Sequence, residues 1–379
     1  MQILKKGEKV GIYCFYIAIL IHLFIMCEEF SMWDMPLRGR LLQLAFVLCA
    51  VKIVTTYYER YEWILMGLVG ALSIAAYLAS AEKYIAYVAV MIFAAKSVDM
   101  GQILDYITWE VFLAIIIIPV LALIGVGGVV VDTRDYGRGI VESRYPLGFS
   151  HANNLHGTLW YLFAMLTYIF KDRFDWRHYA VMAVINAGLF YLTRSRAGFI
   201  VAGIIILAGL AYRYCKEAVF DRIWVYIAGM AAFLVVIVLT FISVSVDCFN
   251  SYGPVLKKLD SLTTGRLSLA YQSAYIGEWK PLSPGGSHAY AVDNGFAGVP
   301  ADYGYIVAIV FIAFIIWLMI RVTIKREGIL YIIVLTTVLY TFMEKTYVIN
   351  DAYMLSNLMY VVAMILLGNA KNETEEHKA

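Results

Sequence analysis

Residues 179–213, YAVMAVINAGLFYLTRSRAGFIVAGIIILAGLAYR, decide the fold class, because two apolar runs, 179–193 and 198–213, flank the polar break TRSRA. Each run approaches the roughly 17 to 25 residues with which an α-helix crosses the hydrocarbon core of a bilayer. A break this short keeps the chain at the membrane boundary. The stretch therefore predicts two neighbouring transmembrane helices joined by a tight turn.

The same apolar character extends over the whole chain. Of its 379 residues, 62% are hydrophobic and 15% are charged, whereas a soluble domain is about half apolar and about a quarter charged. We therefore predict a single integral membrane domain over residues 1–379, with an all-α, polytopic transmembrane helical bundle of about twelve spans. The predicted spans are 10–26, 41–57, 63–80, 84–98, 106–130, 153–170, 179–193, 198–213, 224–243, 302–320, 328–343 and 352–368.

Charge and cysteine usage narrow the function classes. The net charge of +2 is too small to indicate a nucleic-acid-binding protein. Most of the five cysteines lie in or beside apolar runs, and none forms a CxxC pair or has a histidine at metal-ligand spacing. These features favour packing roles over a disulfide framework. The sequence predicts no metal site and no cofactor.

The distribution of lysine and arginine predicts the orientation in the membrane. The N-terminal MQILKKGEKV is basic, precedes an apolar run and is followed by no small-residue cleavage site, so we expect an uncleaved first span. Basic segments such as KDRFDWRH and RVTIKREG then face the cytoplasm, as do both termini. The breaks 131–152 and 194–197 and the long extracytoplasmic loop 244–301 face outward, and each contains arginine against the usual trend.

Arg194 and Arg196 lie in the turn between the two spans of the opening stretch. In one interpretation their side chains extend to lipid headgroups, as those of most interfacial arginines do. The alternative is an anion site, because two guanidinium groups alternating with the hydroxyls of Thr193 and Ser195 can fork onto phosphate oxygens. For the pair we favour the anion site.

The long loop contains a second potential anion-binding element. In TTGRLSLAYQSAYIG, either Thr263 or Thr264 can cap an amphipathic helix over about 265–278, with an apolar stripe that indicates packing on the membrane surface or on the bundle. Arg266 falls in its first turn, where free backbone N–H groups already favour an anion. Arginine there does not help the helix itself, so we favour a functional role for Arg266.

A polar cluster lies at 145–160, YPLGFSHANNLHGTLW, where an outer loop enters a span. It contains His151, Asn153, Asn154 and His156 at the predicted helix start. In one interpretation Asn153 is an N-cap and His156 a hydrogen-bonded core histidine. In the other, the imidazole and amide groups bind sugar hydroxyls. The sequence leaves both open.

Two further segments supply acidic groups on the outer side. Asp293 and Asn294 lie in AVDNGFAGVPADYGY (291–305) before the tenth span, and Glu344 and Lys345 end the eleventh. Asp293 is either a hydroxyl ligand or proton acceptor, or a capping or solvated loop residue. Glu344 either pairs with Lys345 or reaches a shared cavity as a base.

Four motifs follow one another on the predicted outer face, in the order LGFSHANNLHG, YLTRSRAGF, TTGRLSLAYQS and DNGF…DYGY. Over about residues 145–305 this order resembles Wzy-type polysaccharide repeat-unit polymerases, which share a superfamily with the O-antigen ligases, and it looks closest to the forms of Gram-positive bacteria. Arg196 matches the arginine of their S-R-x-G segment and Arg266 that of their G-R-L segment. Asp293 stands where ligases typically carry a histidine, which favours the polymerases.

The resemblance implies a GT-C-like fold and an inverting, metal-independent glycosyltransferase in the bacterial cytoplasmic membrane. Such an enzyme joins undecaprenyl-diphosphate-linked oligosaccharides on the outer face, so one lipid-linked oligosaccharide is the donor and another the acceptor. Membrane lipid, a chain-length regulator and a flippase are the other expected partners. The alternatives are an O-antigen-type ligase and, from a different class, a lipid-linked oligosaccharide flippase or other transporter.

The chemistry of such a transfer assigns a role to each polar group. Without a metal, the departing diphosphate needs fixed cations, and the acceptor hydroxyl needs a proton acceptor. We assign diphosphate binding to Arg194, Arg196 and Arg266, catalysis to Arg196, Arg266, Asp293, His151 and Glu344, and sugar binding to Asn153, Asn154 and Asn294. Asp293, His151 and Glu344, in that order, are the expected proton acceptors.

Overall fold

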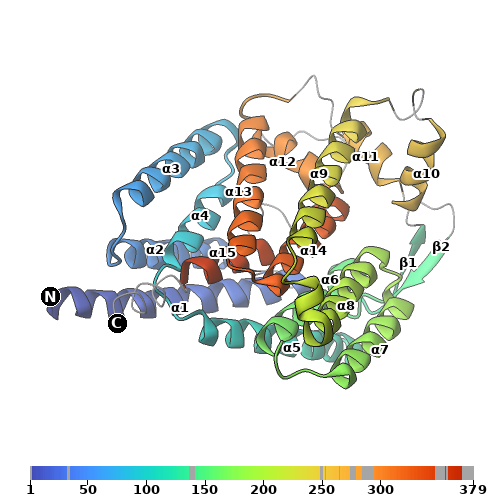
Figure 1. The fold of residues 1–379 in the computed structure, drawn as a ribbon, viewed down its shortest axis with the longest axis horizontal. Coiled ribbons are helices and arrows are strands. Elements are labelled where there is room, and N and C mark those ends of the chain that lie inside the picture. The colour runs from blue at the N-terminus through green and yellow to red at the C-terminus, as the bar shows by residue number, and fades with distance from the viewer. Residues whose placement is uncertain are drawn as a thin grey trace.

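Each of the twelve predicted spans contains an α-helix, and helices dominate the computed structural model (Figure 1). The structure describes residues 2–31, 35–135, 141–247, 251, 253–263, 265–273, 279–283, 293–345, 355 and 357–368. The helices that match the spans are α1 (Gln2–Ser31), α2 (Arg38–Val54), α3 (Arg60–Ser80), α4 (Tyr84–Ala94), α5 (Met100–Leu123), α6 (Ala152–Ile169), α7 (Trp176–Thr193), α8 (Arg196–Val219), α9 (Ile223–Ser245), α13 (Tyr305–Ile324), α14 (Gly328–Met343) and α15 (Leu358–Gly368).

Six of these helices are long and apolar enough to cross a membrane by themselves. They are α1 (over Gly7–Glu28), α3, α5, α8, α9 and α13. Helices α14 and α15 are shorter, and most of their residues are buried among their neighbours. The length and apolar composition of these helices indicate a membrane protein. The count of about twelve spans and the GT-C-like arrangement stay predictions.

The opening stretch folds as predicted into two helices joined by a tight turn. Arg194 ends α7 in the left-handed conformation with φ of 55°, and Ser195 is extended before α8 begins at Arg196. A left-handed residue reverses the direction of the chain in very few residues. The buried hydroxyl of Thr193 accepts a hydrogen bond from the backbone N–H of Ser195 (3.3 Å), which holds the turn closed.

A short β-hairpin corrects the purely α-helical prediction. Strands β1 (Asp132–Asp135) and β2 (Val141–Arg144) pair antiparallel in the outer break 131–152. The Thr133 and Ser143 hydroxyls lie 2.8 Å apart across the ladder. Strands of four residues are too short to give a recognisable alternation of polar and apolar residues, and the sequence alone indicated only a loop.

The described residues of the long loop form three helices, of which the sequence predicted one. These are α10 (Pro254–Leu262), α11 (Arg266–Ser273) and α12 (Gly295–Tyr303). The first turn of α11 is capped by Asp260, whose Oδ1 accepts the backbone N–H groups of Leu267 and Ser268, both at 3.0 Å. Of the two predicted capping residues, Thr263 instead donates its hydroxyl to carbonyls of α10, and position 264 lies outside the described residues, as do 274–278.

Helix α11 packs against the bundle, one of the two predicted placements. Leu267 and Ala270 are buried, and α11 lies along α9 (Figure 1). Ala270 clusters there with Val244 of α9 and Ala297 of α12. The packing against α9 fixes the position of Arg266, the first residue of α11.

Loops predicted to lie on opposite sides of the membrane gather at opposite ends of the helices. At one end, the Tyr145 N–H donates to the Leu192 carbonyl (3.2 Å), so the breaks 131–152 and 194–197 adjoin. At the other, the Lys171 ammonium pairs with the Glu327 carboxylate at 3.0 Å. The grouping agrees with the predicted sidedness, and a cytoplasmic location of both termini stays a prediction.

Candidate functional site

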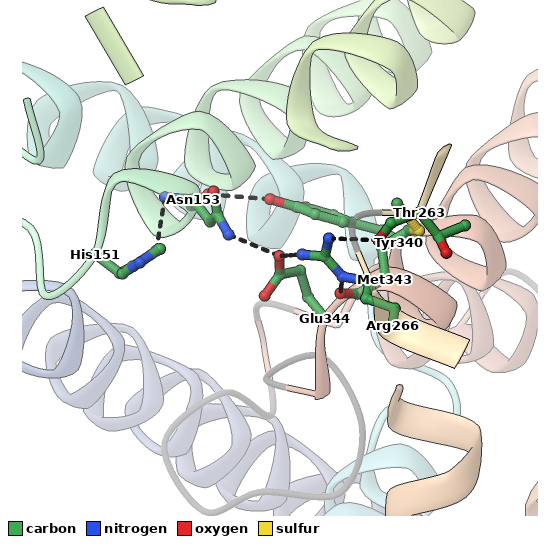
Figure 2. A network of polar contacts seen from close by, with 7 residues as sticks. All are labelled: His151, Asn153, Thr263, Arg266, Tyr340, Met343 and Glu344. Atoms are coloured by element: carbon green, nitrogen blue, oxygen red, sulfur yellow. Dashed lines mark hydrogen bonds and ion pairs between the residues drawn. The ribbon is translucent and has the colours of Figure 1, made fainter. Parts of the chain in front are cut away.

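Three residues from distant parts of the chain meet at the end of the bundle where α6 begins and α14 ends (Figure 2). The Arg266 guanidinium donates from Nη2 to Oε1 of Glu344 at 2.6 Å. The Asn153 amide donates from Nδ2 to the same oxygen at 2.7 Å. The sequence had assigned each of the three a functional role. They form the candidate site.

Arg266 is held along the length of its guanidinium group. Besides the bond to Glu344, its Nε donates to the Met343 carbonyl at 2.6 Å and its Nη1 to the Thr263 carbonyl at 3.2 Å. Its side chain is only 13% exposed. A guanidinium fixed in this way is a preorganised positive charge, which stabilises developing negative charge without reorganising first.

Glu344 is positioned by the end of α14. Its backbone N–H donates to the Tyr340 carbonyl at 2.8 Å, and Glu344 itself is extended as the residue that ends the helix. The Tyr340 hydroxyl donates to the Asn153 carbonyl at 3.0 Å and its ring packs edge-on against Trp160 of α6. These contacts tie α14 to α6 directly beneath the carboxyl group.

The environment of Glu344 brings its titration close to neutral pH. Burial, followed by the negative charge of Asp293, raises the pKa of the Glu344 carboxyl to about 7, although the positive charge of Arg266 and the hydrogen bonds from Arg266 and Asn153 oppose this. Asp293, another predicted site residue, is therefore close enough to act on the same carboxyl. A carboxyl with a pKa near the working pH suits proton transfer.

His151 lies just before α6 and caps that helix, a role that the sequence had suggested for Asn153. Its Nδ1 accepts the Asn153 backbone N–H at 3.1 Å. Burial, then the charges of Arg134 and Arg144 in the hairpin, lower the pKa of His151 to about 4, and Arg266 adds to this. The imidazole is neutral at pH 7, and with Nδ1 accepting, its proton is assigned to Nε2. His151 is thus a neutral side chain at the start of α6.

Arg194 and Arg196 lie at the same end of the helices as the candidate site, outside its hydrogen-bond network. The Arg194 guanidinium lies 4.9 Å from the centroid of the exposed Tyr191 ring, an arrangement typical of an interfacial anchor. Arg196 is exposed, and in the described part of the chain its side chain makes no hydrogen bond or ion pair. Convergence of Arg196 with Arg266 on one anion stays a prediction.

The two other amides predicted to bind sugar have local partners. Asn154 donates to the Ser150 hydroxyl at 2.7 Å. Asn294 is 1% exposed, caps α12 by accepting the backbone N–H groups of Phe296 and Ala297, and donates to the Thr240 hydroxyl. Because these contacts use both ends of its amide, we assign Asn294 a structural role and leave it out of the proposed site.

His156 is a core histidine, which was one of its two interpretations. It is fully buried, with Nδ1 2.9 Å from the Thr193 hydroxyl and Nε2 2.8 Å from Oδ1 of Asn186. Its ring also fills the space beside Gly198, where an added Cβ would approach to 2.8 Å. His156 therefore joins α6, α7 and α8 beneath the turn that carries Arg194 and Arg196.

Replacing His156 with alanine is expected to lower the free energy of unfolding by about 3 kcal/mol, since it leaves a cavity and two unpaired buried groups. Thermal unfolding of the purified variant in detergent measures this. The exposed His178, 51% exposed and paired with Asp175, is the control, and His178→Ala should change stability far less. Equal effects of the two substitutions would contradict the structural role.

Sequence reasoning missed the groups that hold Arg266 in place. Two are backbone carbonyls, of Thr263 and Met343, and a carbonyl has no residue-specific signal. It also missed Tyr340, which ties the end of α14 to Asn153; this residue does have a signal, because it precedes Glu344 by four positions, about one helical turn. No group of His, Cys, Asp or Glu among the described residues is arranged to hold a metal ion, and metal independence stays a prediction.

Comparison with known proteins adds no assignment. No protein-family model, curated protein or solved structure matches this chain.

Proposed function

We propose that this protein is a glycosyltransferase that extends a surface polysaccharide by joining undecaprenyl-diphosphate-linked oligosaccharide repeat units on the outer face of the bacterial cytoplasmic membrane. The observation that carries the proposal is the pairing of Arg266 with Glu344. It combines a fixed cation with a carboxyl whose pKa is raised to about 7. The reaction needs a positive charge to stabilise the leaving diphosphate and a proton acceptor for the attacking hydroxyl, and the two groups match these two needs.

The proposed transfer is a single nucleophilic displacement at the anomeric carbon of the donor sugar. The acceptor hydroxyl oxygen attacks the anomeric carbon of the donor sugar, and the bond from that carbon to the diphosphate oxygen breaks. The diphosphate leaves with the electron pair, next to the Arg266 guanidinium. The hydroxyl proton goes to the Glu344 carboxylate. The new glycosidic bond is formed on the face opposite to the leaving group, so the anomeric configuration inverts.

The neighbours of this pair have supporting roles in the proposal. Asn153 orients the Glu344 carboxyl through the hydrogen bond that its side-chain amide donates at 2.7 Å. Asp293 raises the pKa of Glu344 and so makes it a stronger base. His151, whose imidazole is neutral at pH 7, contacts the sugar. Arg196, exposed at the same end, is the proposed second cation for the diphosphate.

The decisive experiment is extension of a lipid-linked repeat by the purified protein in liposomes, with and without a chelator. Products longer than one repeat, formed equally with chelator, support the polymerase. Transfer of a preformed glycan to a different acceptor, without chain growth, supports a ligase. Movement of the lipid-linked repeat across the bilayer without bond formation supports a transporter. Either of the last two outcomes overturns the proposal.

A further inference from the structure

A groove lined almost wholly by apolar and aromatic side chains runs between α3, α4 and α2, away from the candidate site. Its volume is about 580 Å³, and its walls include Phe46, Trp63, Gly70 and Tyr87. Of the polar lining groups, Ser73 donates its hydroxyl to the Val69 carbonyl of its own helix at 2.7 Å. The groove therefore offers hydrocarbon-like walls rather than hydrogen-bonding groups.

The groove is long compared with one leaflet of a bilayer. Its lining residues on α3 run from Trp63 to Tyr77, a distance of about 21 Å at the helical rise of about 1.5 Å per residue. One leaflet is about half of the roughly 30 Å hydrocarbon core. Along α3 the groove is therefore longer than the depth of one leaflet, so its inner end lies past the depth that the chains of one leaflet fill.

A positive charge lies at one end of the groove. Lys83 lines it and places its ammonium 6.0 Å from the centroid of the Tyr87 ring. Lys83 immediately precedes α4, and Tyr77 near the end of α3 is 51% exposed beside it. A lysine at the mouth of an apolar groove complements a lipid that has an anionic head and a long apolar tail.

The mouth of the groove is connected to the candidate site through α12. Helix α12 contacts α3, and its last residue, Tyr303, is within electrostatic range of Glu82, the neighbour of Lys83. Also on α12, Asp302 forms a 2.6 Å ion pair with Lys345, the residue after Glu344. Helix α12 thus links the mouth of the groove to the residue that follows Glu344.

We infer that this groove binds the polyprenyl chain of the acceptor lipid, with its diphosphate at Lys83. The assignment to the acceptor rests on the proposed function. The diphosphate of the donor has to reach Arg266, because its bond breaks there. The diphosphate of the acceptor stays intact, one repeat unit away from the reacting hydroxyl, and so needs a separate place.

Two glycines on α3 provide a matched pair of test variants. Gly70 lines the groove and Gly67 does not, and a Cβ added at either position meets nothing within 4 Å. Gly70→Phe should fill the groove, whereas Gly67→Phe adds the same ring to the exposed side of the same helix. Ala86→Leu fills the groove from α4 and replaces Gly70→Phe should that variant fail to fold.

The test is photo-crosslinking of the purified full-length protein by a polyprenyl diphosphate that carries a photoreactive group in its chain. We expect labelling of α3 and α4 peptides, at least a tenfold loss in Gly70→Phe, and no loss in Gly67→Phe. Lys83→Gln should weaken labelling severalfold at low salt. The loss should be smaller at high salt, because salt screens the attraction between Lys83 and the diphosphate. Excess undecaprenyl diphosphate should compete, and phosphatidylglycerol should not.

Equal competition by phosphatidylglycerol, or unchanged labelling in the groove-filling variants, overturns the inference. Because crosslinking needs no catalysis, its result is independent of the proposed function. If labelling follows the pattern above but the protein extends no glycan, the groove still binds polyprenyl diphosphate and the proposed polymerase function is wrong. If Gly70→Phe extends glycans normally at low acceptor concentration, the polymerase function stands and the assignment of the groove to the acceptor is wrong.

Discussion

Replacing Arg266 with alanine is expected to lower glycan extension by at least about a hundredfold, the usual cost of removing one fixed charge-stabilising donor. The protein should still insert and fold, because Arg266 lies in a loop helix and not in a membrane span. Arg266→Lys should restore little, since an ammonium cannot reproduce the guanidinium fork that spans Thr263, Met343 and Glu344. Extension of a purified lipid-linked repeat measures both variants.

The residual activity of Arg266→Ala provides a second readout. Arg266 lowers the pKa of the Glu344 carboxyl, so its removal should move the acid limb of the pH–rate profile to higher pH. Arg194→Ala is the control, as that guanidinium stacks on the exposed Tyr191 ring. It should extend glycans at a nearly normal rate.

Arg196→Ala tests the second proposed cation. We expect loss of extension, with poor rescue by lysine, because a point charge cannot fork onto a diphosphate. Normal extension by both Arg196→Ala and Arg266→Ala would refute the diphosphate site.

Replacing Glu344 with glutamine is expected to lower extension by about a hundredfold to ten-thousandfold, the usual range for a proton acceptor. In the unmodified protein the carboxylate is the active form and its pKa is about 7. The rate should therefore be half-maximal near pH 7 and fall about tenfold for each pH unit below it. Glu344→Gln should have little dependence on pH in this range, which a rate profile from pH 5 to pH 9 would measure.

Asp293→Asn separates the two acidic candidates. Asp293 raises the pKa of Glu344 by its negative charge, so its neutralisation should shift the acid limb to lower pH and leave the limb present. If the limb disappears in Asp293→Asn and persists in Glu344→Gln, Asp293 is the base. His151→Asn should change the binding of substrate more than the pH profile, because His151 is already neutral at pH 7.

The sequence by itself determined the helical, membrane-embedded class of this protein. Apolar runs such as 198–213 and 224–243 are local signals, since their length and composition suit a membrane span. A helix is the one structure in which a single segment satisfies all of its own backbone hydrogen bonds in lipid. The turn at Arg194 followed in the same way from a polar break too short for a loop. The hairpin at 132–144 and the helix α10 did not follow, because short elements depend on their neighbours for stability.

The tertiary structure alone decided which polar groups act on one another. Arg266 and Glu344 are 78 positions apart, and Asn153 and Glu344 are 191 apart. From the sequence, Lys345 was the nearest partner for Glu344, yet Lys345 pairs with Asp302 on α12. A carboxyl group responds to the charges and burial around it in space, and these are fixed by how α6, α11 and α14 pack.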